Sequence, residues 1–460
     1  MAIKFGTDGW RAIIGKEFTF DNVKKVAQAH ASHIKAKGGR KAVVGYDTRF
    51  LSREFAEIVA EVFASNGLDV ILSSNFCSTP ALTLMAKESE ADEGVMITAS
   101  HNIYKYNGYK VKTGFGSPAT PQIIKDIEER INLEDVKTGV KKWEEMDFNK
   151  YYVEKLKSYI TPNIFKQKKS KVIHDPMFGA TQGLLKDVLE DTFIDTVEIN
   201  HYRDVLFGNH HPEPIDKNLT LLKRKVIAEK GDVGIANDGD GDRVGIVDEK
   251  GRFIGTQMGY ILLLLHTIRN RGVEGAIAKT VSVSYLVDRI AKKEGRKLYK
   301  TPVGFKYIAE LFEKDKIAFG GEESGGYGFG FHIPERDGLL AGLMILEMMY
   351  LHNKTVSQLI EDVFNEFGTA YYLREDVKVE GDKGKVLVDK LRNEGIKEFA
   401  GFDVVDIDRT DGIKFIFKND GWIMFRASGT EPVLRIYAEM PEKAQVRLVL
   451  EEGKKLLREV

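Results

Sequence analysis

Three consecutive segments of the chain repeat one layout, and this repetition constrains the fold more than any other feature. Each segment opens with a short apolar strand pattern and continues through alternating helix and strand patterns. The opening strand patterns cover residues 41–49, 170–180 and 275–284. Such alternation is typical of α/β units with largely parallel sheets. Because the chain has 460 residues, it is also too long for a single hydrophobic core.

The last part of the chain follows a different pattern. From about Tyr371, strand patterns follow one another directly, two of them joined by a turn at 419–421, and a helical pattern closes the chain. We therefore expect three similar mixed-sheet α/β domains and a C-terminal α+β domain around a central active-site cleft. The expected domains span residues 1–147, 148–251, 252–368 and 369–460.

The third strand pattern of each repeat ends in a loop rich in polar residues or glycine. These loops are "TASHN" at 98–102, "NDGDGDR" at 237–243 and "GGEESGG" at 320–326. In open α/β sheets, ligands bind beyond the carboxyl ends of the strands. We therefore expect the three loops to face one shared cleft.

Composition excludes several classes of protein. The formal net charge of -1 provides no general attraction to nucleic acid or to acidic lipid. The single cysteine, Cys77, permits neither an internal disulfide nor a cysteine-based zinc site. The apolar stretches 258–268 and 339–351 are too short to span a bilayer and predict buried helices. With no signal-peptide pattern at the N-terminus, we expect a cytoplasmic protein with neither nucleic-acid nor membrane partners.

The loop "DGDGDR" predicts a metal site. Asp238, Asp240 and Asp242 alternate with glycines, and three carboxylates so close together repel one another unless a hard cation lies between them. An EF-hand is excluded because its sixth position requires glycine, where this chain has Arg243, although Glu249 falls at the twelfth. We favour Mg²⁺ that also contacts a phosphate over a polar turn without a metal.

Two further segments are candidates for substrate binding. Near "RASGTEPVLR", two guanidinium groups and two hydroxyls surround a glycine, a set that suits phosphate better than a plain hairpin connection. The residues are Arg426, Ser428, Gly429, Thr430 and Arg435. In "GGEESGG", Glu322 and Ser324 suit neutral sugar hydroxyls, but a flexible turn fits that loop equally well.

Ser100 and His101 raise the question of a nucleophile. No G-x-S-x-G elbow is present, and adjacent residues on an extended chain point apart, so we expect His101 to be poorly placed to deprotonate Ser100. Two alternatives remain: a serine that caps the next element, or a serine that carries a phosphoryl group. Of these two alternatives, only a phosphoserine would give the serine, metal and sugar loops a role in one shared site.

Taken in order, the four motifs resemble the α-D-phosphohexomutase family, the phosphoglucomutases and phosphomannomutases. "TASHN…YNGYK" resembles the family's active-serine loop, "DGDGDR" its metal loop, "GEESGG" its sugar loop and "RASGTEP" its phosphate loop. The resemblance covers the whole chain. One departure is Ile103, where the family usually has proline after "SHN", but this change removes no chemical group.

The resemblance implies a role for each matching residue. Ser100 would be phosphorylated, and its phosphate would join Asp238, Asp240 and Asp242 around Mg²⁺. The sugar and its fixed phosphate would be held by the residues of the sugar and phosphate loops. The residues implied around the transferring phosphoryl group are Arg11, His101, Lys110 and Arg243, and weaker substrate-binding matches are Lys279, Gly304 and Lys306. Arg11 itself lies in the turn "FGTDGWR" with Thr7, which composition alone does not distinguish from an exposed turn.

The implied reaction is reversible phosphoryl transfer between the C1 and C6 hydroxyls of glucose phosphate, and of its mannose equivalent. Glucose 1,6-bisphosphate would prime the enzyme. The alternatives are a phosphoglucosamine mutase, a Mg²⁺-dependent sugar phosphatase, or a phosphosugar-binding protein without turnover. The general base is either Lys110 or His101, and the sequence leaves the oligomeric state open.

Overall fold

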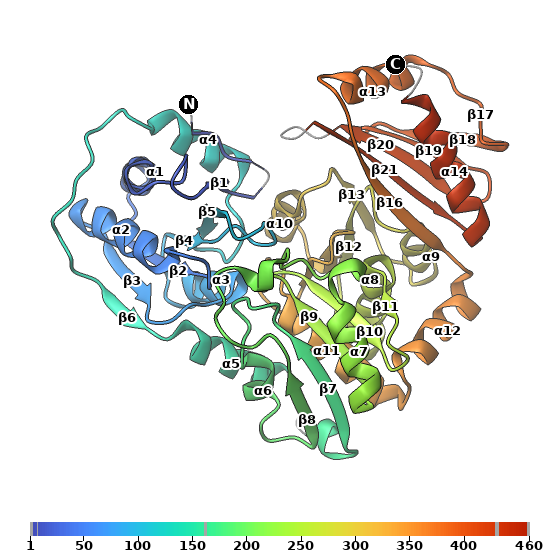
Figure 1. Cartoon of the computed structure of the whole chain (residues 1–460), viewed down its shortest axis with the longest axis horizontal. Helices are drawn as coiled ribbons and strands as arrows, with labels where there is room; N and C mark the ends of the chain where they lie inside the picture. Colours follow the sequence, from blue (N-terminus) through green and yellow to red (C-terminus); the bar gives the residue numbers. More distant parts are fainter. Residues whose placement is uncertain (1–2, 7, 161–162, 428–431, 458–460) are drawn as a thin grey trace.

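The computed structural model describes residues 3–6, 8–160, 163–427 and 432–457. The strands in these ranges form four sheets. The first and fourth sheets lie on opposite sides of the molecule, and the second and third lie between and below them (Figure 1). The expected architecture of three α/β domains and a C-terminal domain is therefore confirmed.

The first sheet is mixed, in the order β1-β5-β4-β2-β3-β6. Strands β2, β3, β4 and β6 run parallel to one another, while β5 is antiparallel to both of its neighbours, β4 and β1. Val43 and Val44 pack into different cores on opposite faces, as the alternation of a strand requires. The elements are β1 Trp10–Ile13, α1 Phe20–Ala36, β2 Lys41–Tyr46, α2 Ser52–Ser65, β3 Asp69–Ser73, α3 Thr79–Glu88, β4 Glu93–Ile97, β5 Tyr106–Thr113, α4 Pro121–Arg130, β6 Glu144–Met146 and α5 Phe148–Tyr159.

The second sheet has the order β11-β10-β9-β7-β8, and β10 is antiparallel to both of its neighbours, β9 and β11. The helical sequence pattern of residues 181–191 forms only a short helix, because Gly183 has a φ of 76° and Ala180 donates a hydrogen bond to the Gly239 carbonyl at 3.0 Å. That contact holds the preceding loop against the metal loop. The elements are η1 Ile164–Lys166, β7 Ser170–Asp175, α6 Leu184–Val188, β8 Ile194–Glu198, η2 Phe207–Asn209, η3 Asp216–Asn218, α7 Thr220–Glu229, β9 Val233–Asn237, β10 Val244–Asp248 and β11 Phe253–Ile254.

The third sheet has the order β13-β12-β14-β15, and only β15 is antiparallel. The two apolar stretches form α8 and α11, so the prediction of buried helices is confirmed. The elements are α8 Thr256–Leu265, η4 His266–Asn270, β12 Ala276–Thr280, α9 Leu286–Lys293, β13 Leu298–Thr301, α10 Phe305–Lys314, β14 Ile317–Gly321, β15 Tyr327–Phe329, α11 Gly338–His352 and α12 Val356–Phe367.

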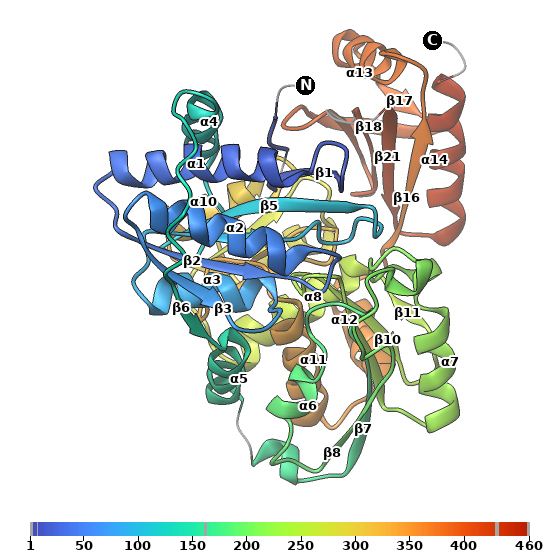
Figure 2. The same ribbon diagram turned by 60° about the vertical axis from the view of Figure 1, so that its left-hand side comes forward.

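The fourth sheet is entirely antiparallel, in the order β16-β21-β20-β19-β18-β17. The predicted turn at 419–421 joins β19 to β20, where Asp420 has a φ of 68°. Helix α14 packs along β16 and β21 (Figure 2). The elements are β16 Tyr371–Lys378, α13 Lys383–Asn393, β17 Glu398–Phe399, β18 Phe402–Asp408, β19 Ile413–Phe417, β20 Trp422–Ala427, β21 Val433–Met440 and α14 Lys443–Leu456.

Among the helices that the structure describes, none is long and apolar enough to cross a membrane. The cytoplasmic location stays a prediction.

Candidate active site

Ser100 lies in a tightly held turn after β4. The Thr98 hydroxyl donates to Asp47 at 2.6 Å and accepts a hydrogen bond from the Ser100 amide at 2.9 Å. The buried Arg49 guanidinium donates to the Ser100 carbonyl at 2.5 Å and to the Asn102 carbonyl at 2.6 Å. Ser100 itself has a φ of 52°, an uncommon conformation for a residue with a side chain. This local network offsets the strain and fixes the serine in place.

The expectation that Ser100 and His101 point apart was wrong. Because Ser100 is left-handed rather than extended, its Oγ lies 3.3 Å from His101 Nδ1. The same hydroxyl donates to Asp238 Oδ2 at 2.8 Å. The enclosed position of the ring lowers the pKa of His101 well below its usual value, and Arg243 and Arg11 add to that effect. The serine and metal loops therefore meet at this one hydroxyl.

The metal loop carries three fully buried carboxylates. Asp238, Asp240 and Asp242 each offer an oxygen, and these oxygens lie within 4.8 Å of one another. Burial raises the pKa of Asp238 well above its usual value, and repulsion from Asp242 and Asp240 adds to the increase. Oδ1 of Asp240 and Oδ1 of Asp242 are buried without a hydrogen-bond partner in the described part of the chain. Hard oxygen donors in this arrangement fit Mg²⁺.

Close packing around the glycines brings this loop to the serine. A Cβ at Gly239 would stand 2.5 Å from the Ser100 carbonyl oxygen, so any side chain there would push the two loops apart. Gly241 has a φ of 76°, which favours glycine. In this loop the aspartates supply the carboxylate oxygens, and the glycines allow the close approach to the serine loop.

Lys110 faces the same carboxylates from β5. Its Nζ lies 2.8 Å from Asp240 Oδ2, 3.1 Å from Asp242 Oδ2 and 2.8 Å from Asp8 Oδ2. Burial alone would lower the pKa of Lys110, but Asp240, Asp242 and Asp8 overcome that effect and raise it. Lys110 is therefore a permanent positive charge beside the metal loop.

Arg11 and Arg243 also lie at this centre. Arg11 Nη1 donates to Asn102 Oδ1 at 2.8 Å, on the serine loop. The Arg243 amide donates to Asp238 Oδ1 at 3.0 Å, and its guanidinium lies 3.5 Å from Glu213. The predicted cations thus come from two domains toward Ser100.

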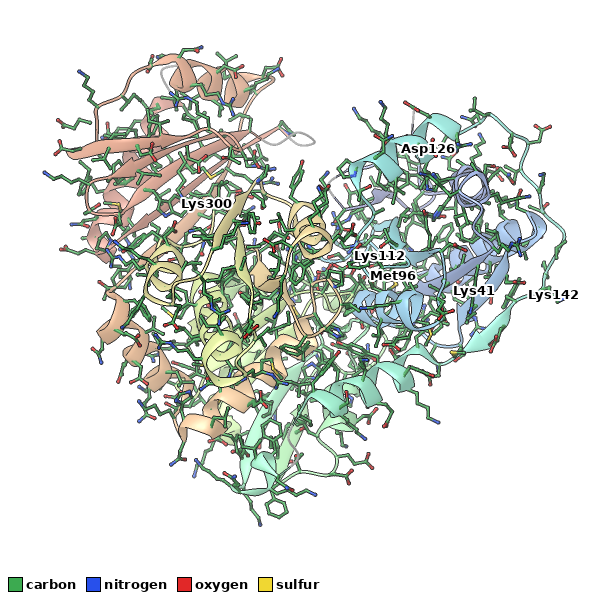
Figure 3. All side chains as sticks on the ribbon, turned by 180° about the vertical axis from the view of Figure 1, so that it is seen from behind. Lys41, Met96, Lys112, Asp126, Lys142 and Lys300 are labelled. Carbon is green, nitrogen blue, oxygen red and sulfur yellow. The ribbon has the colours of Figure 1, made fainter. Side chains whose placement is uncertain are left out.

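The sugar loop reaches this centre through a residue that the sequence did not single out. Arg336 donates to Asp242 at 2.6 Å, to Asp8 at 2.8 Å and to Glu322 at 3.3 Å. Glu335, which precedes Arg336 in the sequence, pairs with Lys112, labelled in Figure 3. One guanidinium therefore connects the N-terminal turn, the metal loop and the sugar loop.

Glu322 and Ser324 lie on the loop after β14. Burial raises the pKa of Glu322 to about 6, although Arg336 opposes the shift. The buried Ser324 Oγ has no hydrogen-bond partner among the residues that the structure describes. Buried polar atoms of this kind suit the hydroxyl groups of a ligand.

Thr79, at the start of α3, is a second residue that the sequence did not reveal. Its amide donates to the Asp240 carbonyl at 2.8 Å, and its hydroxyl donates to Asp240 Oδ2 at 2.5 Å. The motif "STPAL" is a normal helix start, with Ser78 as its cap, and this ordinary role hides the contact with the metal loop.

The weaker candidates lie further out. Lys279 Nζ donates to the Ser284 carbonyl at 2.8 Å and pairs with Asp288 of α9. Gly304, with a φ of 134°, precedes α10. Lys306 lines a cavity of about 150 Å³ together with Asp8. Of these three, Lys306 is the one that faces the N-terminal turn.

The described part of the phosphate loop shows both arginines. Arg426 Nε donates to Asp411 at 2.8 Å, and Asp411 accepts the Val303 amide of the third domain at 3.0 Å. Arg435 is paired opposite Arg426 between β20 and β21 and lies 3.7 Å from Asp376. Ser428, Gly429 and Thr430, and Thr7 near the N-terminus, lie outside the described residues.

Comparisons with known proteins agree with this geometry. Residues 2–138, 150–251 and 255–367 match the models of phosphoglucomutase/phosphomannomutase α/β/α domains I, II and III. Residues 377–455 match the C-terminal domain of the same family.

Relatives match over nearly their whole length. A phosphoglucomutase/phosphomannomutase from Thermococcus kodakarensis is 34% identical, over 99% of this chain and 98% of its own. A phosphoglucosamine mutase from Methanococcus maripaludis is 29% identical, over 98% and 97%. The crystal structure of a Thermus thermophilus protein, named as a phosphomannomutase, has a TM-score of 0.90 at 34% identity and covers 100% of this chain and 99% of its own.

Fold and site together define an α/β enzyme of the phosphohexomutase class, whose reactions are isomerisations. The chain belongs to the phosphoglucomutase/phosphomannomutase family.

Proposed function

We propose that this enzyme moves a phosphoryl group reversibly between the C1 and C6 hydroxyls of glucose phosphate and its mannose equivalent, through phosphorylated Ser100 and a hexose 1,6-bisphosphate. One observation carries the proposal: Ser100 Oγ lies 2.8 Å from Asp238 Oδ2. A phosphoryl group on this hydroxyl would therefore adjoin the carboxylates of the metal loop.

Asp238, Asp240 and Asp242 would hold Mg²⁺, with an oxygen of phosphorylated Ser100 as a further ligand. When bound, Mg²⁺ supplies positive charge that offsets the negative charge of the transferring phosphoryl group. The buried Oδ1 atoms of Asp240 and Asp242, which have no hydrogen-bond partner among the described residues, support this assignment.

The surrounding side chains supply the rest of the chemistry. Lys110, Arg11 and Arg243 stabilise charge on the transferring group. His101 Nδ1 lies 3.3 Å from Ser100 Oγ, whereas Lys110 is paired with three carboxylates, so His101 is the better placed of the two candidate bases. His101 would therefore exchange the proton of the reacting hydroxyl.

The sugar and phosphate loops would hold the part of the substrate that does not react. Glu322 and Ser324 would bind sugar hydroxyls in either orientation of the bisphosphate. The other proposed substrate-binding residues are Arg426, Ser428, Gly429, Thr430 and Arg435 for the fixed phosphate, with Lys279, Gly304 and Lys306 around them. We assign these roles to domains that span 1–147, 148–251, 252–368 and 369–460.

The relatives are named for different sugars, and these names suggest two candidate substrates. The Thermococcus kodakarensis relative is named for glucose and mannose, and the Methanococcus maripaludis relative for glucosamine. Identity favours glucose and mannose by a narrow margin, because another relative, named as a probable phosphoglucosamine mutase, is 33% identical over 95% of this chain. Phosphoglucosamine is therefore the second candidate substrate.

³¹P NMR of the purified enzyme tests the proposal. Glucose 1-phosphate, Mg²⁺ and a trace of glucose 1,6-bisphosphate are mixed with the protein, and a 6-phosphate signal is expected to grow without free phosphate. Growth of inorganic phosphate alone would instead identify a sugar phosphatase. Parallel samples with mannose 1-phosphate and glucosamine 1-phosphate rank the sugars, and a clear preference for glucosamine would overturn the substrate assignment.

A further inference from the structure

A second cavity lies at the junction of the third domain with the fourth sheet. Its volume is about 310 Å³, and its walls come from β12, β13 and α9 on one side and from β18, β19 and β20 on the other. Among the described residues that line it, none belongs to the serine, metal or sugar loop. Lys300, on β13, lies beside the fourth sheet in Figure 3. The volume is at the lower end of the range for small-molecule sites.

The walls of this cavity are positively charged. Five basic side chains line it against three acidic ones. Asp288 pairs with both Lys279 and Lys300, and Asp420 pairs with Arg289 at 2.6 Å. Two carboxylates therefore serve three of the cations, so the cavity favours an anionic group such as a phosphate.

Lys414 on β19 is the unusual member of this set. It is only 8% exposed, its Nζ donates to the Val281 carbonyl at 2.7 Å, and the ring centre of Trp422 lies 3.8 Å away. Within the described chain, no carboxylate lies within 4 Å of this amine. Glu439, the nearest acidic group on the sheet, uses its Oε2 to accept the Tyr285 amide and the Trp422 indole.

The surroundings of Lys414 favour its neutral form. Burial lowers the pKa of Lys414 to about 7, and repulsion from Lys279 and Lys300 adds to the decrease. Glu439 and Asp288 oppose it without restoring the ordinary value. A lysine that is neutral near physiological pH is a nucleophile toward carbonyl carbon.

We propose that this cavity is a second ligand site, which takes small phosphate esters that carry an aldehyde or ketone, and that Lys414 binds their carbonyl carbon as an imine. The Nζ lone pair attacks the carbonyl carbon and forms the C–N bond, and the carbonyl oxygen takes up a proton. The nitrogen then loses its protons to the solvent and to the departing oxygen, which leaves as water, and C=N remains. The step is reversible and requires neither oxidant nor reductant.

The other cations of the cavity would hold the phosphate. Among the described residues, Lys292 forms no ion pair, and Lys300 shares Asp288 with Lys279. An aromatic or planar ligand would also contact the Trp422 ring. Of the residues proposed above to bind the mutase substrate, Lys279 also lines this cavity.

Pyridoxal 5′-phosphate, a small phosphorylated aldehyde, is the probe. It is added in limiting amount to the full-length enzyme at pH 7, borohydride then delivers hydride to the C=N bond, and the modified peptides are located by mass spectrometry. Lys414 is expected to be modified at least about tenfold faster than the exposed Lys418, because far more of its amine is neutral. The rate should rise to half its maximum near pH 7, and inorganic phosphate should slow it.

Matched variants make the result decisive. Lys414→Met and Lys414→Arg should lose the modification, and the arginine variant, which can still donate to the Val281 carbonyl, serves if the methionine variant fails to fold. Lys418→Met should be modified at Lys414 like the unchanged enzyme. Ser100→Ala should also be modified normally, which separates this site from the proposed mutase reaction. Equal modification of Lys414 and Lys418, or no effect of phosphate, would overturn the proposal.

Discussion

Lys110 and Lys414 are both buried lysines, yet their two regions treat positive charge in opposite ways. The side chain of Lys110 is 1% exposed and lies within 3.1 Å of three carboxylates, so its pKa is raised. Lys414 is 8% exposed and has a backbone carbonyl and an indole ring as partners, so its pKa falls to about 7. Burial disfavours the charge in both cases, and the neighbouring carboxylates decide the outcome.

The two lysines lie in different kinds of region: Lys110 at the candidate active site and Lys414 at a domain junction. At the centre, Lys110 and Arg336 offset the charge of the metal loop and hold three segments together. At the junction, cations exceed carboxylates, and the excess lies open to a cavity. Each prediction below perturbs one of these two regions.

Ser100→Ala should have the largest effect. Without the hydroxyl that donates to Asp238, no phosphoryl group can be carried at the centre, and mutase turnover should fall by at least about a thousandfold. The ³¹P assay measures it, with the exposed Ser158→Ala as control. Turnover close to normal in homogeneous protein would contradict the role of Ser100.

Asp240→Ala should remove both activity and the response to Mg²⁺. The change deletes one of three oxygens that surround the proposed cation and also a partner of Lys110. Binding of Mn²⁺, followed by electron paramagnetic resonance, gives a readout that does not depend on turnover. The exposed Asp195→Ala is the control, and an unchanged metal response in Asp240→Ala would refute the metal site.

Lys110→Met should lower kcat/KM by about a hundredfold, because a charge beside the transferring group is lost. Its three carboxylate partners, Asp8, Asp240 and Asp242, would then repel one another more strongly, with Arg336 still paired to Asp8 and Asp242. Lys105→Met, on the exposed part of the serine loop, serves as the control in the same kinetic assay. Equal kinetics for the two variants would show that the charge of Lys110 does not matter to the reaction.

Lys414→Met should have the smallest effect, a gain in stability whose size depends on pH. The folded pKa of Lys414 is below the unfolded one, so the unfolded chain binds more protons between about pH 7 and pH 10.4, and stability rises with pH across that window. Replacing the lysine removes a penalty that is complete below pH 7. The apparent melting temperature should therefore rise by about 2 °C at pH 6.

The gain from Lys414→Met should shrink toward pH 10, and thermal scans of both proteins across this range measure it. Lys418→Met, whose side chain is exposed, should show no such trend. A gain that does not change with pH would mean that Lys414 keeps its proton in the folded protein.

Much of the fold followed from local patterns. The threefold alternation of helix and strand predicted three α/β domains, and the alternating strands after Tyr371 predicted the fourth. The local pattern of residues 181–191 is longer than α6, because the Ala180 amide is bonded to the Gly239 carbonyl, a contact that no local pattern contains.

The site was only partly visible in the sequence. Asp238, Asp240 and Asp242 are close in the chain, so their meeting needed no knowledge of the fold. Arg336 and Thr79 reach the same carboxylates from 94 and 161 residues away, respectively, and their own neighbours in sequence suggest only a loop and a helix start. Contacts over such distances depend on how the domains are packed.

The sequence by itself determined the class of fold and the clusters of chemical groups, since strand and helix periodicity and short motifs are properties of neighbouring residues. Tertiary structure alone decided the orientation of Ser100 toward His101 and Asp238, because that depends on a left-handed residue held by Arg49 and Thr98. It also decided that Lys110 keeps its charge while Lys414 tends to lose it. The two side chains have the same covalent structure, but their pKa values shift in opposite directions. Folding surrounds Lys110 with carboxylates, and it places Lys414 against a backbone carbonyl and an indole ring.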